Sequence, residues 1–218
     1  MKDLNIAVQK PPAHEVVYHQ MREMILFGEL APGQAVTIQG LVSRLGSGTT
    51  PVREAIRHLT AEGALKFKGN RRICVPELTP AQLKELSFAR LAIEPELARL
   101  AVSHMSAEDI QKLEKTDDQL DDAIAKGDIG AYLKQNYSFH HDLYGLAEAP
   151  ILKSIALSLW LRAGPSLRIV CGRFGTENLP DKHDEALAAM RARDANAVAQ
   201  AIADDIRQGH EHIKRALS

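Results

Sequence analysis

The stretch TTPVREAIRHLTAEGAL, residues 49–65, carries side chains suited to reading DNA. Thr50 and Pro51 are typical of a helix start, and Arg53 and Arg57 lie four residues apart, on one helix face. An apolar stripe runs beside them: Val52, Ala55, Ile56 and Leu59. An arginine binds guanine bidentately in the major groove or contacts a phosphate. The stretch therefore predicts a short helix with a buried back and an exposed cationic front.

The flanking segments predict the elements that position this helix. In chain order they are a helix over 14–27, a capped helix over 38–45, a turn over 46–49, and strands over 65–68 and 73–75. The hairpin tip GNRR, residues 69–72, contributes two cations, Arg71 and Arg72. Three helices and a two-stranded wing form a winged helix-turn-helix.

Three segments in this order resemble the GntR transcription regulators: GELAPGQ, TTPVREAIRHLTAEGAL and the basic wing. The resemblance implies that Thr49, Thr50 and Arg53 contact operator DNA from the recognition helix, and that Arg71 contacts it from the wing. The implied partner is double-stranded operator DNA.

Two positions depart from that family's pattern. Gly48-Thr49 stands where Ser-Arg is usual, and Arg72 stands where the wing tip usually has Gly. These departures concern which operator sequence is read rather than DNA binding itself.

Charge is divided unevenly along the chain. Residues 1–76 carry 10 Lys/Arg and 6 Asp/Glu, a formal charge of +4, whereas residues 77–218 carry 17 and 22, a formal −5. The overall charge of −1 hides this division. We therefore expect a basic DNA-binding domain over 1–76 and a second domain over 77–218.

Composition indicates a cytoplasmic protein with well-formed cores. Apolar residues make up 45% of the 218 positions. Cys74 and Cys171 are far apart and have no metal-binding or redox spacing, which suggests reduced thiols. No apolar run approaches the roughly 20 residues that span a bilayer, and MKDLNIAVQKPP lacks the core of a signal peptide. We expect no membrane partner.

Periodicity after Pro80 predicts helices throughout the second domain. One helix starts at Thr79-Pro80 and is kinked at Pro95, and others start at Ser106, Asp128 and Pro150. We expect a break or a kink at 164–165, a loop over 172–180, and two last helices near 180–193 and 195–216. The fold class is therefore mainly α: a winged helix-turn-helix followed by an all-α bundle of about six helices.

Three segments of this second domain resemble the FCD ligand-binding domain attached to one GntR subfamily. They are ARLAIEPELARLA (89–101), NYSFHHDLY (136–144) and KHDEALAAMRARDANAVAQAI (182–202). Together with the recognition helix and wing, the resemblance covers nearly the whole chain. It implies that residues 77–218 bind an effector and hold the dimer together.

The FCD resemblance also implies a divalent metal, held by an Asp and a His one helical turn apart and by two later His residues. By position, these ligands become Asn136, His140, His183 and Asp205. Two nitrogens and two oxygens can hold Zn²⁺, Ni²⁺ or Mn²⁺, leaving open positions for an effector carboxylate. The alternative is structural, with His140 and Asp205 as a hydrogen-bonded pair in the core.

Two arginines are candidates for binding the effector. Arg90 matches a position that the resembled domain uses near its ligand, and a buried arginine suits a carboxylate bidentately. Its alternative is an ion pair with Glu94, four residues on. Arg162, which follows Trp160 on another helix, is a second candidate for the same role.

These observations together predict a homodimeric, ligand-responsive transcription regulator, a repressor of a metabolic operon that senses a small organic acid. A regulator of the same architecture that holds no metal and binds an acyl ligand is the first alternative. An enzyme is the second, but the chain has no HExxH motif, no phosphate loop and no evident pairing of a nucleophile with a base. We therefore expect no catalysis.

Overall fold

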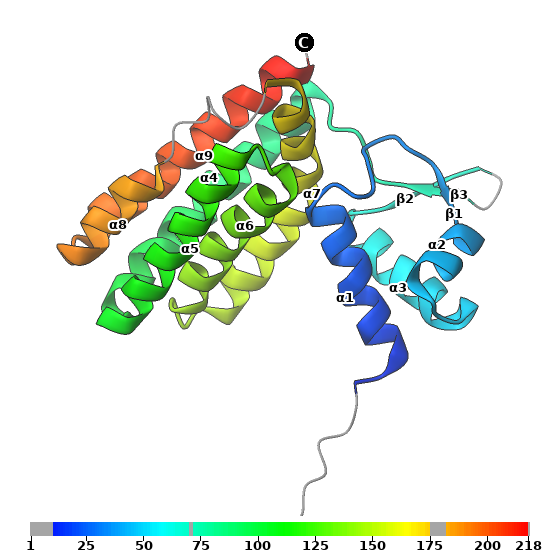
Figure 1. Ribbon diagram of the computed structural model, residues 1–218, viewed down its shortest axis with the longest axis horizontal. Coiled ribbons are helices and arrows are strands. Elements are labelled where there is room, and N and C mark those ends of the chain that lie inside the picture. The colour runs from blue at the N-terminus through cyan, green and yellow to red at the C-terminus, as the bar shows by residue number, and fades with distance from the viewer. Residues whose placement is uncertain (1–10, 70–71, 175–181, 218) are drawn as a thin grey trace, which may run out of the picture.

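The computed structural model of the protein describes residues 11–69, 72–174 and 182–217. A winged helix-turn-helix leads into a bundle of long helices, and Figure 1 shows the two parts side by side. This mainly α fold confirms the prediction from the sequence. In the part of the chain that is described, no helix has the length and apolarity needed to cross a bilayer.

The first part consists, over its described residues, of three helices and a small sheet. The helices are α1 (Ala13–Leu26), α2 (Ile38–Leu45) and α3 (Thr49–Ala61), and the strands are β1 (Val36–Thr37), β2 (Lys66–Lys68) and β3 (Arg72–Cys74). The strand order is β1-β3-β2, and both pairs are antiparallel. Strand β1 is an addition to the predicted two-stranded wing.

The start of α3 differs from the expectation. The cap residue is Gly48, in an extended conformation, so Thr50 lies inside the first turn and does not cap the helix. The first four N–H groups of any helix lack an intrahelical partner, so a proline is tolerated throughout the first turn. A proline at position 51 therefore does not require Thr50, the residue directly before it, to be the cap of the helix.

The second part contains six helices within the described ranges, as predicted. They are α4 (Pro80–His104), α5 (Ala107–Lys126), α6 (Ile129–Gly145), α7 (Pro150–Phe174), α8 (His183–Arg191) and α9 (Ala195–Leu217). Reciprocal capping boxes at Thr79/Gln82 and Ser106/Asp109 begin α4 and α5. Gly127 ends α5 in the left-handed conformation, and Asp128 caps α6.

Of the break or kink expected at Gly164-Pro165, the structure excludes the break, because α7 continues through both residues to Phe174. The expected loop over 172–180 is thereby shortened, and 175–181 lie outside the described residues. An internal proline costs a helix about 3 kcal/mol. Here the surrounding turns bury Leu161, Ala163 and Val170, and this tertiary packing outweighs the local penalty.

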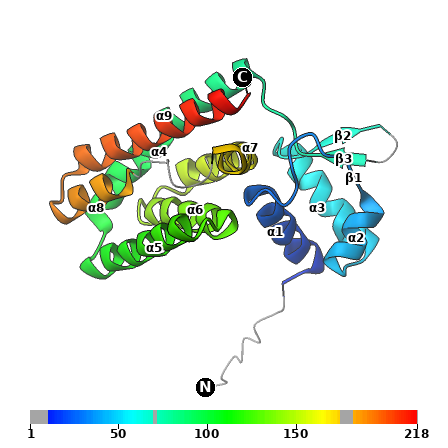
Figure 2. The ribbon, with the colours of Figure 1, turned by 45° about the horizontal axis from the view of Figure 1, so that its top comes forward.

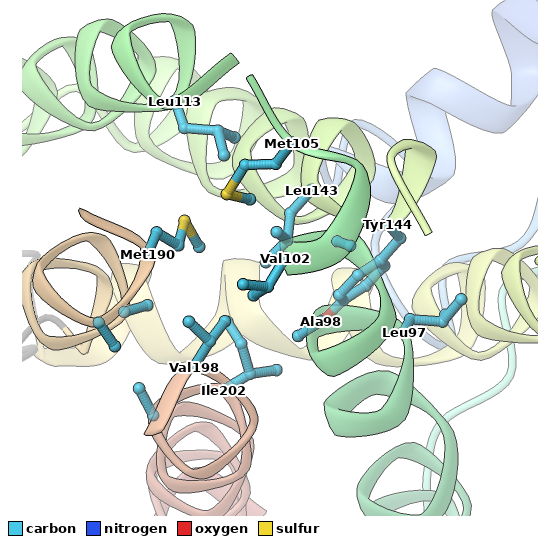
Figure 3. Packing of buried hydrophobic residues seen from close by; sticks show 14 of the residues in the cluster. Leu97, Ala98, Val102, Met105, Leu113, Leu143, Tyr144, Met190, Val198 and Ile202 are labelled. Atoms are coloured by element: carbon cyan, nitrogen blue, oxygen red, sulfur yellow. The ribbon is translucent and has the colours of Figure 1, made fainter. Parts of the chain in front are cut away.

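The core of the bundle lies between α4, α6, α8 and α9. Figure 3 shows Ala98 and Val102 of α4 facing Val198 and Ile202 of α9. Leu143, Tyr144 and Met190 close the same cluster from α6 and α8. This packing fixes the relative positions of the helices that carry the predicted metal ligands.

Helix α7 also belongs to the core of the winged helix-turn-helix. Trp160 and Leu161 are buried in the same cluster as Met21, Ile25 and Leu59. Both views show α1 lying against α7 (Figures 1 and 2). The junction between the two parts is therefore a shared hydrophobic core rather than a flexible linker alone.

Gly164 allows a close approach between α7 and α1. A Cβ atom at this position would lie 2.8 Å from the backbone oxygen of Leu26 and 3.3 Å from its Cα. Backbone atoms cannot move aside as the end of a side chain can, so only glycine fits here. The last turn of α1 thus lies directly against α7.

We expect Gly164→Ala to destabilise the protein by about 1–3 kcal/mol, because overpacking at this contact exceeds the gain of up to about 1 kcal/mol in helix propensity. Gly172→Ala is the matched control on α7, since a Cβ there meets open space. Urea unfolding measures both. If Gly164→Ala is as stable as Gly172→Ala, the contact is not tight.

Candidate functional site

The recognition helix α3 presents a polar front and a buried back. Thr49, Thr50, Arg53 and Arg57 are exposed, whereas Val52, Ala55, Ile56 and Leu59 are buried in the core. Arg57 donates to Glu54 at 3.1 Å. Arg53 has no ion-pair partner among the described residues, so its guanidinium is available to DNA.

The wing carries exposed cations on both of its strands. Arg72 is exposed on β3 and is paired in register with Lys68 of β2, so both side chains lie on one face of the sheet. Lys66 is two residues from Lys68 and shares that face. Arg71 lies outside the described residues. Neither lysine was predicted from the sequence as a DNA-binding residue. The available signal was their spacing, because residues two apart on a strand lie on the same face.

Three predicted metal ligands meet at one point between α6, α8 and α9. The ligand atoms of His140, His183 and Asp205 all lie within 4.8 Å of one another. The two histidine Nε2 atoms are 3.3 Å apart, and Asp205 Oδ2 is 3.3 Å from Nε2 of His140. Both rings are buried, whereas the Asp205 side chain is partly exposed.

Hydrogen bonds on the far side of each ring set its tautomer. Asp117 Oδ1 lies 2.8 Å from Nδ1 of His183, and a carboxylate only accepts, so this Nδ1 carries the proton. The Tyr144 hydroxyl donates to Glu94 at 2.7 Å, so its oxygen accepts from Nδ1 of His140 at 3.0 Å. When the rings are neutral, both Nε2 lone pairs therefore face each other.

The cluster thus presents three acceptors to a common point and needs a cation there. Burial lowers the pKa of His140, although Asp205 opposes the shift, so the ring stays neutral near pH 7. Burial would raise the pKa of the Asp205 carboxyl, but the hydrogen bond that it would accept from a protonated His140 and the positive charge of Arg90 bring this pKa to about 2. Asp205 is therefore an anion, and the donor set suits a divalent metal.

Asp117 is a candidate positioning residue that was not predicted from the sequence. A carboxylate that holds the Nδ1 proton of a ligating histidine orients the ring and raises its basicity. The available signal was a buried acid within an apolar helix face, since Asp117 of α5 lies between Leu113 and Leu120.

Asn136 lies near this cluster in a cavity of about 50 Å³. It is buried one helical turn before His140 and lines the cavity with His183 and Asp205. The cavity also has an apolar wall, formed by Leu120, Ile124, Leu167, Val170 and Cys171. A polar end and an apolar side suit a small amphipathic effector.

Arg90 lines this cavity but is fully engaged. Its Nε and Nη2 atoms donate to Glu94 at 2.6 and 3.0 Å, which is the ion pair considered as the alternative. Its guanidinium carbon lies 4.6 Å from the centre of the Trp160 ring. The charge of Arg90 is therefore balanced by Glu94 before any effector carboxylate arrives.

The structure places Arg162, the second candidate for binding an effector, away from Arg90. Arg162 lies outside this cavity and donates to the backbone oxygen of Glu62, at the end of α3, at 2.8 Å. Two residues turn a helix by about 200°, so a side chain two positions after Trp160 points to the opposite side of α7. Arg162 therefore tethers α7 to the recognition helix.

Comparison with known proteins agrees with both halves of this geometry. The model of the "gntR family" of bacterial regulatory proteins matches residues 13–75, and that of the FCD domain matches residues 85–208. The HTH-type transcriptional regulator McbR of Escherichia coli K12 is 28% identical over 95% of this chain and 92% of its own. The structure of E. coli McbR/YncC has a TM-score of 0.90, with 25% identity, and covers 96% of this chain and 100% of its own.

A winged helix-turn-helix joined to a helical FCD domain defines a DNA-binding transcription regulator rather than an enzyme. The chain belongs to the gntR family, in the branch that carries an FCD domain.

Arg53→Ala is expected to cost about 1–3 kcal/mol of operator affinity and to relax preference at one base pair, as loss of a base contact does. Arg72→Ala removes a wing cation and should weaken binding more uniformly, with a smaller salt slope. Fluorescence anisotropy on a duplex selected from random DNA measures both. Arg191→Ala is the control, because this exposed arginine lies on α8, outside the DNA-binding half. Wild-type affinity for Arg53→Ala would contradict the assignment.

Proposed function

We propose that this protein is a cytoplasmic repressor that binds a palindromic operator as a homodimer and responds to a small carboxylate effector. Residues 1–76 bind DNA and residues 77–218 bind the effector. A divalent metal, Zn²⁺, Ni²⁺ or Mn²⁺, helps to hold that effector. Two relatives support a repressor: RspR of E. coli K12 is named a transcriptional repressor and is 24% identical over 94% of this chain. A probable D-xylose utilization operon repressor of Paenarthrobacter nicotinovorans is 25% identical over 90%.

For DNA, the proposed contacts come from the exposed front of α3 and from the wing. Thr49, Thr50 and Arg53 lie at the amino-terminal end of α3, where a recognition helix meets base edges. Arg71 and Arg72 of the wing supply cations for phosphates. The family match over residues 13–75 supports this assignment.

The convergence of three acceptors carries the proposal of a metal. Nε2 of His140, Nε2 of His183 and a carboxylate oxygen of Asp205 would hold the ion, and the Asn136 amide is the fourth candidate ligand. A bound divalent ion would supply a Lewis acid for an effector carboxylate. Asp117 and Tyr144 would keep the two rings oriented toward it.

A regulator of the same architecture that holds no metal is the second candidate. The apolar wall of the cavity, with Leu120, Leu167 and Val170, favours an effector with an acyl portion. A single proton shared within the cluster would then replace the metal as the cation.

Metal content and thermal stability separate the two candidates. We expect about one metal ion per chain by elemental analysis, and a lower melting temperature after dialysis against EDTA, because a ligand at 100 times its Kd adds about 2.7 kcal/mol. His183→Ala should abolish the metal-dependent part of the stability, and Asp117→Asn should weaken metal affinity about 10–100-fold.

His14→Ala is the matched control, because this exposed histidine lies on α1, in the DNA-binding half. A protein without metal, whose melting temperature EDTA leaves unchanged, would favour the second candidate. Ligand-dependent release of DNA that persists in His183→Ala would show that the cluster is only structural.

The proposed homodimer uses the exposed flank of α4 and α7, two helices that pack against each other. Phe88 of α4 and Ile151 of α7 are each 75% exposed, and Ile155 lies one turn after Ile151. We assign a second copy of this chain to this flank. One winged helix covers a single half-site, and members of this family are typically dimeric.

Phe88→Asp is expected to weaken the dimer by at least about 2 kcal/mol, or about 30-fold. In the proposed interface the partner would cover this aromatic side chain, and the substitution would place a charge there instead. Sedimentation equilibrium gives the dissociation constant. Phe67→Asp is the matched control, since Phe67 is 60% exposed on the wing. Equal dissociation constants for the two variants would exclude the α4–α7 flank as the dimer interface.

A further inference from the structure

Trp160 contacts the candidate metal centre from α7. Its ring centre is 5.0 Å from that of His140, and its Nε1 donates to Glu94 Oε2 at 3.0 Å. Tyr144 donates to the same oxygen at 2.7 Å and accepts from His140. Three hydrogen bonds thus join His140 to the indole, through the Tyr144 hydroxyl and one carboxylate oxygen of Glu94.

The same indole belongs to the core of the DNA-binding half. Trp160 is buried in the cluster formed by α1 and α3. Its ring meets Tyr137 edge-on at 5.7 Å, and Tyr137 meets Phe27, which follows α1, edge-on at 6.0 Å. Helix α1 in turn packs against α3, the recognition helix. A continuous set of packed side chains therefore runs from His140 to α1.

This set can transmit a change because each of its members contacts the next. Occupation of the cluster by a cation replaces mutual repulsion between the two Nε2 lone pairs with attraction to a common centre, which displaces the His140 ring. Tyr144, Glu94 and Trp160 follow, since each shares a short hydrogen bond with the next. Packed cores shift between discrete arrangements rather than deforming freely.

We propose that Trp160 is the positioning residue through which occupancy of the His140–His183–Asp205 cluster sets the position of α1 and thereby of the recognition helix. This inference rests on the proposed function, since it assumes that the cluster is the sensing site. It adds a route from that site to the DNA-binding half.

Two other contacts cross the junction and supply controls. Arg162 donates to the Glu62 backbone oxygen at 2.8 Å, and Arg22 donates to that of Leu157 at 3.1 Å. Both bind backbone atoms, and neither side chain lines the cavity that holds the cluster. Loss of one of them loosens the junction without interrupting the path through Trp160.

The first test measures coupling at saturating Zn²⁺ in the full-length protein. Operator affinity is compared with and without Zn²⁺, and the Zn²⁺ affinity of each variant is measured separately by calorimetry. In the wild type we expect a change in operator affinity of roughly 5- to 150-fold, the usual range of allosteric coupling. In Trp160→Phe the change should fall below about 2-fold, and in Arg162→Gln it should persist. A persistent change in Trp160→Phe overturns the relay while leaving the metal site intact.

The single tryptophan gives an independent signal, since Trp160 is the only one in the chain. Its emission should change when Zn²⁺ is added and again when operator is added, because the ring touches both regions. Emission that responds to Zn²⁺ but not to operator would contradict the link to α1.

A second test requires no metal. Tyr144→Phe removes the hydroxyl between His140 and Glu94, and we expect it to change operator affinity several-fold in the metal-free protein. The same substitution should have no further effect in a Trp160→Phe background, or beside Phe27→Leu at the other end of the path. Additive effects, or no effect of Tyr144→Phe alone, would overturn the relay. If Zn²⁺ does not bind, the metal proposal fails and this cycle alone decides the relay.

Discussion

The buried carboxylate of Glu94 is the interaction on which both halves of the protein depend. Its side chain has no exposed surface, and it accepts hydrogen bonds from Arg90, Tyr144 and Trp160. These donors come from α4, α6 and α7, so one anion fixes three helices. Removal of one partner of a buried pair costs about 3–5 kcal/mol, because the other charge is left without compensation. The ion pair with Glu94 is therefore a structural reason for an arginine at position 90, whether or not an effector binds there.

Glu94 also explains why the histidine cluster is polarised toward a cation. Because Glu94 accepts the hydrogen bond of the Tyr144 hydroxyl, Nδ1 of His140 must donate to that hydroxyl oxygen. In the neutral ring, Nε2 of His140 therefore carries no proton. Asp117 does the same for His183 from another helix. Two carboxylates outside the cluster thus create a site that is unfavourable when empty of any cation. The surrounding core, with Phe139 stacked on the His183 ring at 3.9 Å, provides the stability that holds it.

The sequence predicted features whose physical cause is local, and it failed where distant contacts decide. Capping boxes and Gly127 marked helix ends correctly, because the capping groups lie within a few residues. Pro165 does not break α7, because burial against α1 and α4 outweighs the local penalty, and no local pattern records those contacts. Asp117 was missed for the same reason, since its partner is 66 residues away. The sequence analysis also did not consider which side of α7 Arg162 occupies, two residues and about 200° beyond Trp160.

Asn136 and Asp205 both differ from the resembled ligand pattern, but the two changes together leave the charge of the four-ligand set unchanged. The resembled pattern of one Asp and three His carries one negative charge, and so does the present set of Asn136, Asp205 and two neutral histidines. The carboxylate has moved from α6 to α9, the helix that packs most extensively against α4. There the positive charge of Arg90 helps to keep Asp205 ionised. A divalent ion would therefore leave this site with a net positive charge, as an anionic effector requires, although its oxygen ligand comes from a different helix.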